Sequence, residues 1–266
     1  MKREVRYEQL RPAEIRKARE ACPVAYLPIG TIEWHGFHNP IGLDTLKAHA
    51  LCVRIAEKGG GLVFPALYYG ESREEGLMEA NSGDREKIAE AMGLPPENFA
   101  PGYMRRSPAE ENSGYQWLLL HVLNQLQSLG FRVIVLSAGH YPLIDHARAA
   151  CHVFHQQRWE NRRARVIPWA FIGYELVQDR YPFAGDHAAY WETSLLMALL
   201  PGLTDLSLLP EDPEEPLVGV GGARHPRDAT AEKGEEFIDA VAERVLEQVG
   251  DRLKNPEKYY GHGLIL

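Results

Sequence analysis

The sequence predicts an α/β domain in which helices cover a mainly parallel sheet. Short, continuous apolar runs of strand length alternate along the chain with longer segments of helical periodicity. The apolar runs lack the polar alternation of a half-exposed strand, which is typical of parallel strands buried on both faces. No linker-like tract divides the 266 residues, and a chain of this length can bury one large core. We therefore expect a single domain over 1–266.

Four segments have the composition of buried strands. Residues 132–138 (RVIVLSA) are the strongest example, because β-branched and other apolar side chains fill a short run that a glycine follows. The first run in the chain, 24–29 (VAYLPI), leads directly into a polar motif. The other two candidates are 62–67 and 165–171.

Seven segments have the spacing of helices. The clearest is 115–129, where leucine and valine side chains share one face before Gly130 ends the helix. Asp44 could serve as the N-cap of another, which the three glycines at 59–61 would end. The remaining predicted helices are 8–20, 84–92, 143–159, 192–200 and 232–253.

Composition argues against several classes of protein. The net charge of −8 disfavours nucleic-acid binding, which rests on clustered Lys and Arg. Three distant cysteines form neither a disulfide framework nor a CxxC pair, and they fit a reducing compartment. The charged N-terminus lacks the apolar core of a signal peptide, and no run reaches the ~18 apolar residues of a membrane span. We expect a cytoplasmic protein that binds neither nucleic acid nor membrane.

The first polar motif, GTIEWHGFHNPIGLD, has side chains that bind metals. Glu33 and His35 are two residues apart, so in an extended segment both would face the same side. Asp44 could return to the same point if Gly36 and Gly42 let the loop fold tightly. Carboxylate and imidazole together suit a divalent ion such as Zn, Mn or Fe. The alternative is a surface turn with solvated carboxylates.

Two further stretches carry polar side chains. His140 follows the predicted strand 132–138 and a glycine, where it is either a ligand or a turn histidine bonded to the backbone. His187 and Glu192 precede an apolar helix, and Glu192 could equally favour the dipole at that helix start. Ligands of parallel sheets bind beyond the carboxyl ends of strands. The first motif and His140 both follow strands, so we expect them at the same edge of the sheet.

Four motifs, in order, resemble the creatininase (creatinine amidohydrolase) family. The first keeps the family form P-x-G-x-x-E-x-H-G-x-H-x-P-x-x-x-D over 28–44. The second is PALYYG at 65–70, and the third is SAGH at 137–140, with Ala138 where the family has Asn. The fourth, H-x-x-x-x-E-T-S at 187–194, stands ahead of an apolar helix.

The resemblance implies a three-layer α/β/α sandwich, a centre of one or two divalent ions and a small-molecule substrate. Family members are commonly homo-oligomers, often hexamers. Proton transfer would fall to His187, with Glu192 either a ligand or a carboxylate beside the metal. The metal ligands that the resemblance implies are Glu33, His35, Asp44, His140 and Glu192.

Two departures from the family pattern affect the substrate. Pro142 stands where creatininase has a glutamate that binds the second metal, and proline cannot ligate through its side chain. An insert at about 71–112, rich in Glu and Arg, replaces a short link. An irregular stretch of this length is usually a functional loop or an oligomer contact. We expect His38, Tyr141 and Arg73 to contact the substrate.

These observations favour a metal-dependent hydrolase of the amidohydrolase type. A metal-bound hydroxide would attack the carbonyl of a cyclic amide or related C–N compound, and His187 would protonate the leaving group. The same groups could open a cyclic ketone, such as an oxidised inositol, by C–C cleavage. A peptide-maturation protease and a non-catalytic metal-binding protein are further alternatives.

Overall fold

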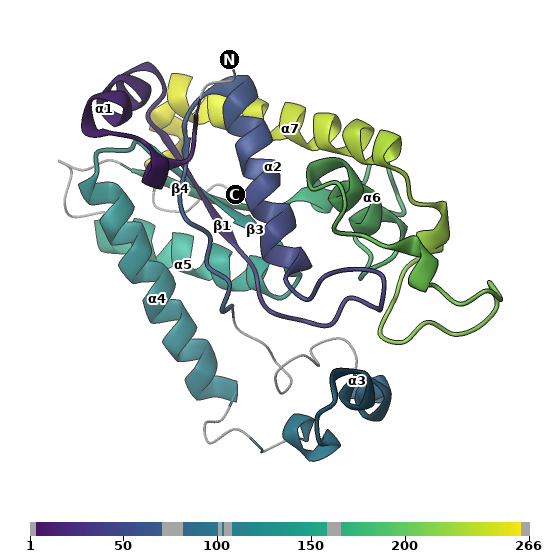
Figure 1. The fold of residues 1–266 in the computed structure, drawn as a ribbon. Coiled ribbons are helices and arrows are strands. Elements are labelled where there is room, and N and C mark those ends of the chain that lie inside the picture. Colours follow the sequence, from purple (N-terminus) through teal and green to yellow (C-terminus); the bar gives the residue numbers. More distant parts are fainter. Residues whose placement is uncertain (1–3, 71–81, 101–102, 104–107, 159–165, 262–266) are drawn as a thin grey trace.

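A computed structural model of the chain describes residues 4–70, 82–100, 103, 108–158 and 166–261. These residues form a four-stranded sheet with helices on both faces (Figure 1). The strand order is β2-β1-β3-β4, and every neighbouring pair is parallel. The strands are β1 (Val24–Ile29), β2 (Leu62–Val63), β3 (Val133–Ala138) and β4 (Ile167–Ile172).

Alternate residues of each strand face different helical layers. Tyr26 and Val135 pack in the core on the side of α2, α6 and α7, whereas Leu27 and Leu136 pack on the side of α1, α4 and α5. The predicted three-layer α/β/α architecture and its parallel sheet are therefore confirmed. The helices are α1 (Pro12–Ala21), α2 (Leu43–Gly59), α3 (Arg85–Met92), α4 (Pro108–Ser128), α5 (Leu143–Arg158), α6 (Tyr190–Leu199) and α7 (Ala231–Lys254).

Strand β2 is shorter than the predicted 62–67. Leu62–Val63 pairs with β1, and the chain then continues along β1 with single bonds, from Phe64 N to Tyr26 O and from Leu67 N to Pro28 O. Pro65 lies inside this run, and a proline cannot donate to a ladder. The apolar run therefore follows the sheet edge beyond the two residues that pair as a strand.

Helices α2 and α4 begin earlier than predicted. Helix α2 begins at Leu43, with Gly42 as N-cap, so Asp44 lies in the first turn and not at the cap. Helix α4 begins at Pro108, seven residues before the predicted start at 115. Its first turns are polar and carry no apolar periodicity, but proline at the first position and glutamates after it suit a helix start.

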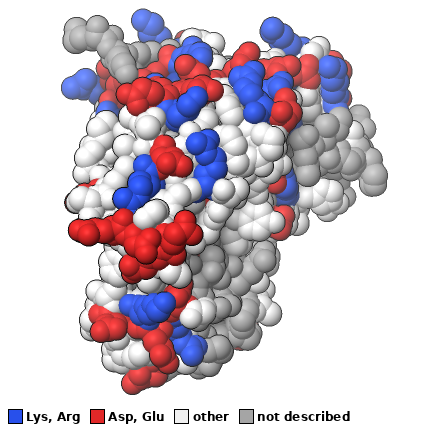
Figure 2. All heavy atoms as spheres, turned by 90° about the vertical axis from the view of Figure 1, so that its right-hand side faces the viewer, with Lys and Arg blue, Asp and Glu red and all other residues white. Residues whose placement is uncertain are grey.

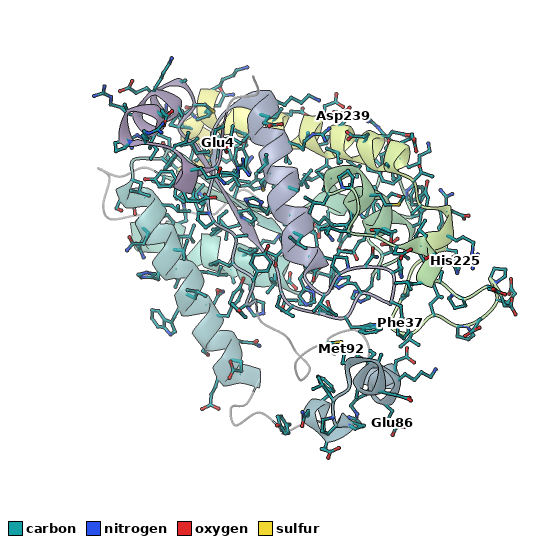
Figure 3. The ribbon with its side chains drawn as sticks, in the orientation of Figure 1. Glu4, Phe37, Glu86, Met92, His225 and Asp239 are labelled. Carbon is teal, nitrogen blue, oxygen red and sulfur yellow. The ribbon has the colours of Figure 1, made fainter. Side chains whose placement is uncertain are left out.

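The described part of the predicted insert packs against the loop after β1. Ile88 and Ala89 of α3 form a small apolar cluster with Trp34 and Phe99, apart from the two main cores. Figure 3 shows Phe37 on the side of that loop toward α3, and its ring meets Trp34 edge-on at 5.1 Å. Helix α3 and Phe99 therefore pack against the loop that carries the first polar motif.

The described surface shows no broad basic patch on the face drawn in Figure 2, where acidic and basic side chains are interspersed. Among the residues that the structure describes, none of the helices combines the length and apolar character of a membrane span.

Candidate metal centre

The predicted ligands meet at the carboxyl ends of β1 and β3. Glu33 and His35 lie on the loop that leaves β1, and Asp44 lies in the first turn of α2 after that loop. His140 follows β3, which is the neighbour of β1 in the sheet. Glu192 joins them from the first turn of α6. The shared edge that the sequence predicts is therefore present, because parallel neighbours end side by side.

Glycines let the first turn of α2 approach both strands. A Cβ atom at Gly139 would lie 2.7 Å from the carbonyl carbon of Asp44, and one at Gly30 would lie 2.7 Å from the Thr45 Cα. Gly36 has a φ of +73°, as the predicted tight loop requires. Gly42, however, has a φ of −91° that any residue adopts, so the expectation that it folds the loop was wrong.

Asp44 lies between two imidazoles. Its Oδ2 is 3.2 Å from His140 Nδ1, which is also 3.0 Å from Glu33 Oε2. Its Oδ1 is 3.2 Å from His35 Nε2, which is 3.8 Å from Glu192 Oε2. We call Glu33, Asp44 and His140 the first ligand set, and His35, Asp44 and Glu192 the second ligand set.

The donor chemistry of both sets fits a divalent ion. In each set the ligand atoms lie within 4.8 Å of one another, and all five side chains are buried. Carboxylate oxygen with imidazole nitrogen is a donor set for Zn or similar metals. His35 Nδ1 lies 3.0 Å from the Glu33 carbonyl oxygen, to which it can donate. That bond directs the lone pair of Nε2 toward the second ligand set.

The buried carboxylates favour positive charge on the neighbouring imidazoles. Burial alone would lower the pKa of both imidazoles, but Asp44, Glu192 and Glu33 raise that of His35 to about 9. Asp44 and Glu33 likewise raise the pKa of His140 to about 10. Burial favours the neutral form of Asp44, yet the two imidazoles hold its pKa well below the usual range. Both shifts favour the protonated imidazoles, so protons and a metal ion would compete for these nitrogens.

His187 lies beside both sets with one nitrogen committed to the backbone. Its Nε2 is 2.9 Å from the Trp34 carbonyl oxygen, so the ring donates there and Nδ1 carries the lone pair. Nδ1 is 4.0 Å from Glu33 Oε2, and the ring centroid is 4.4 Å from that of His35. Burial, and then the neighbouring His35, lowers the pKa of His187. The geometry also lets Glu33, His35 and His187 converge as a third group.

Lys47 is a site residue that our sequence reasoning missed. It lies one turn after Asp44 on α2, is 8% exposed, and forms an ion pair with Glu192 Oε1. Burial would lower its pKa, but Glu192 and then Asp44 raise it above the ordinary value. The pKa of Glu192 is lowered, because Lys47 and His35 outweigh burial. A lysine at the i+3 position from a predicted ligand was the available signal.

Asp186 supports Glu192 from the preceding loop. Its carboxylate accepts hydrogen bonds from the backbone N–H groups of Trp191, at 2.6 Å, and of Glu192, at 3.1 Å. These bonds satisfy two donors at the start of α6. Burial, and then the Glu192 charge, raises the pKa of Asp186 to about 7.

A cavity of about 570 Å³ opens onto the ligand sets. Tyr141 is 61% exposed at its wall, and its ring stacks near that of Tyr174 with 6.3 Å between centroids. Pro142 also lines the cavity and offers no donor atom there. Other lining residues are Glu33, Asp44, Lys47, His140, Asp186, His187 and Glu192.

His38, which was predicted to bind substrate, does not line this cavity. His38 is 2% exposed, and its Nε2 is 2.9 Å from the Ala188 carbonyl oxygen. It borders a second cavity, of about 330 Å³, together with Val218 and Leu208. Ala188 has a φ of 57°, so His38 holds a left-handed residue next to His187. Arg73 lies outside the described residues.

Comparison with known proteins places these features in one family. The sequence profile of creatininase, described as creatinine amidohydrolase, matches residues 8–82 and 111–249. The unmatched residues between these blocks lie within the predicted insert. A creatinine amidohydrolase of Pseudomonas putida is 27% identical over 260 residues, which cover 89% of this chain and 92% of that protein.

Solved creatininase structures have the same fold. A manganese form is 23% identical with a TM-score of 0.69, and the match covers 96% of this chain and 100% of the other. A mutant creatininase of Zn–Zn type is 24% identical with a TM-score of 0.69, covering 96% of this chain and 99% of the other.

Proposed function

The chain belongs to the creatininase family and is a metal-dependent amidohydrolase, and from this premise we propose that it opens a small cyclic amide in the 570 Å³ cavity. The observation that carries the proposal is Asp44, whose two carboxylate oxygens face His140 and His35 at 3.2 Å. Such a carboxylate can serve two cation positions at once. A cavity of this size takes a small molecule.

We propose that the first ligand set holds a divalent ion. Glu33 and Asp44 would bind through carboxylate oxygens, and His140 through Nδ1, which already faces both. When bound, the ion would act as a Lewis acid that polarises a carbonyl and lowers the pKa of bound water toward ~7. Relatives solved in Zn–Zn and Mn forms favour zinc or manganese, and iron fits the same donors.

In this proposal His187 moves the proton. The Trp34 carbonyl holds the proton on Nε2, so Nδ1 is the basic atom. The lowered pKa keeps the imidazole neutral at pH 7, ready to take up a proton at Nδ1 and pass it to the leaving nitrogen. His38 would act as a positioning residue, because its bond to the Ala188 carbonyl fixes the backbone next to His187.

Tyr141 and Tyr174 would bind the substrate ring. Their rings line the cavity with 29° between planes, which suits stacking with a flat heterocycle. Glu192, held by Lys47, would be a carboxylate beside the reacting bond as well as a donor of the second ligand set. A substrate contact of Arg73 stays a prediction.

A substrate screen tests the proposal. Protein loaded with zinc or manganese would be assayed against creatinine, other cyclic amides and lactams, with chelated protein and His187→Ala as controls. We expect ring opening of a cyclic amide that the chelator abolishes. Cleavage of cyclic ketones alone would move the reaction to a C–C bond, as the absence of a ligand atom at Pro142 could allow. Cleavage of peptides alone, or of no substrate, would overturn the proposal.

We also propose that residues 1–266 act as one domain within a homo-oligomer, such as a hexamer. Trp117, 70% exposed, and Leu118, 39% exposed, lie side by side on α4 and favour a subunit contact. Light scattering coupled to gel filtration would measure the mass. A monomer at micromolar concentration would contradict this proposal.

A further inference from the structure

The two ligand sets differ in the charge that already lies beside them. Lys47 reaches the second ligand set, where its ammonium pairs with Glu192 and lies 3.8 Å from Asp44 Oδ1. The side chain is 10% exposed, so solvent does little to screen the charge. At the first ligand set, Glu33 Oε2 lies 3.0 Å from His140 Nδ1 and 4.0 Å from His187 Nδ1.

The ammonium therefore competes with a second ion. It occupies one carboxylate oxygen of Glu192 and approaches the Asp44 oxygen that the second set would need. A divalent ion bound there would lie within a few ångströms of a buried like charge, which is strongly repulsive in a low-dielectric site. Because the amino group is anchored on α2, one turn from Asp44, it cannot leave the site without breaking the ion pair.

Charge balance leads to the same conclusion. Three carboxylates supply the two sets, from Glu33, Asp44 and Glu192. Asp186 also lines the cavity, but its carboxylate oxygens accept from the backbone N–H groups of Trp191 and Glu192, and it belongs to neither set. One divalent ion and the Lys47 ammonium supply three positive charges, which match these three negative charges. Two divalent ions with the ammonium would supply five. A buried site is far more stable when its charges are matched.

We propose that this chain binds one divalent ion, at the first ligand set, and that the Lys47 ammonium occupies the place of a second cation by holding Glu192. The inference rests on the proposed metal-dependent function and specifies its site. Lys47 also lines the cavity, so its charge faces the bound substrate as a second metal would. Lys47 is thus a positioning residue for Glu192 and a fixed cation of the active site.

Metal counting with manganese tests the inference. Metal-free protein would be titrated with Mn²⁺, bound metal per chain measured by elemental analysis, and electron paramagnetic resonance recorded. For the wild type we expect one ion per chain and the signal of an isolated Mn²⁺. Lys47→Met keeps the length of the side chain without its charge, so we expect up to two ions and a spin-coupled signal. Lys58→Met, on an exposed lysine of the same helix, should match the wild type.

Two ions per wild-type chain, with spin coupling, would overturn the inference while leaving the hydrolase proposal intact. A folded Lys47→Met variant that still binds one ion would also overturn it. If that variant does not fold, the wild-type count and its spectrum still decide, and Lys47→Gln provides a second test. One bound ion without turnover of any cyclic amide would instead overturn the proposed function alone.

Discussion

Replacing His38 tests whether its imidazole stays neutral in the folded protein. His38 is 2% exposed. Burial, with His35 and His225 adding to it, lowers its pKa from 6.5 to about 4, against the opposing hydrogen bond of the Ala188 carbonyl. The unfolded chain therefore binds more protons than the folded one between these two values. Stability that is present above pH 6.5 is lost as the pH falls toward 4.

The size of the effect follows from the two pKa values of His38. A difference of about 2.5 pKa units corresponds to about 3 kcal/mol in the free energy of unfolding. Roughly 2 kcal/mol of this is lost when the pH falls from 7 to 4.5. Urea unfolding of metal-free wild type and His38→Asn at these two pH values would measure it. The wild type should lose roughly 2 kcal/mol more than the variant on acidification. At pH 7 the variant should be about 1 kcal/mol less stable, for the lost hydrogen bond.

Comparing the wild type with His38→Asn isolates the contribution of His38 to the pH dependence of stability, because His35 and His140 are present in both proteins. His152→Asn, at an exposed position on α5, controls for the loss of a histidine as such. Equal losses of stability in the wild type and His38→Asn would refute the reasoning. They would mean that the folded protein protonates His38 as easily as the unfolded chain does.

Three further predictions concern the site. His187→Ala should lower turnover by about 10²- to 10⁴-fold with metal content unchanged, whereas His140→Ala should lose bound metal. Kinetics combined with elemental analysis would show the reverse pattern if the roles of the two histidines are exchanged. Gly139→Ala should lower the free energy of unfolding by about 2 to 3 kcal/mol, because the added Cβ would clash with the Asp44 carbonyl. Gly83→Ala is the matched control, since no atom lies within 4 Å of a Cβ there, and equal Tm values for the two variants would contradict the clash. Removing metal with a chelator should lower the Tm and re-adding it should restore the Tm, since an ion that binds the folded state stabilises it; an unchanged Tm would count against a structural role for the ion.

The central strands could be predicted because a short continuous run of apolar residues indicates a strand buried on both faces. The run 132–138 corresponds to β3 within one residue, and 24–29 corresponds to β1. Strand β2 was overpredicted, because an apolar run shows burial and not which of its N–H groups pair. The start of α4 was missed for the opposite reason, since its first turns are polar and exposed and carry no periodicity.

The convergence of the proposed ligands could be predicted because each follows a strand or begins a helix that follows one. Placement after parallel neighbours brings Glu33 and His140 to one edge regardless of the details of the loops. Lys47 could not be found in this way. Its role depends on Glu192 of α6, which is 145 residues away in sequence. Only the packing of α2 against α6 shows that the lysine points into the site.

Pro142 and Lys47 have related consequences once both are placed in the cavity. Relative to a chain with a glutamate at 142 and an apolar residue at 47, the proline removes one negative charge and the lysine adds one positive charge. Together they raise the net charge of the site by two, which equals the charge of one divalent ion. A buried site that gains this charge can restore its balance by binding one ion fewer. The altered residue at 142 is therefore compatible with a working metal centre, provided that Lys47 stays charged and paired with Glu192.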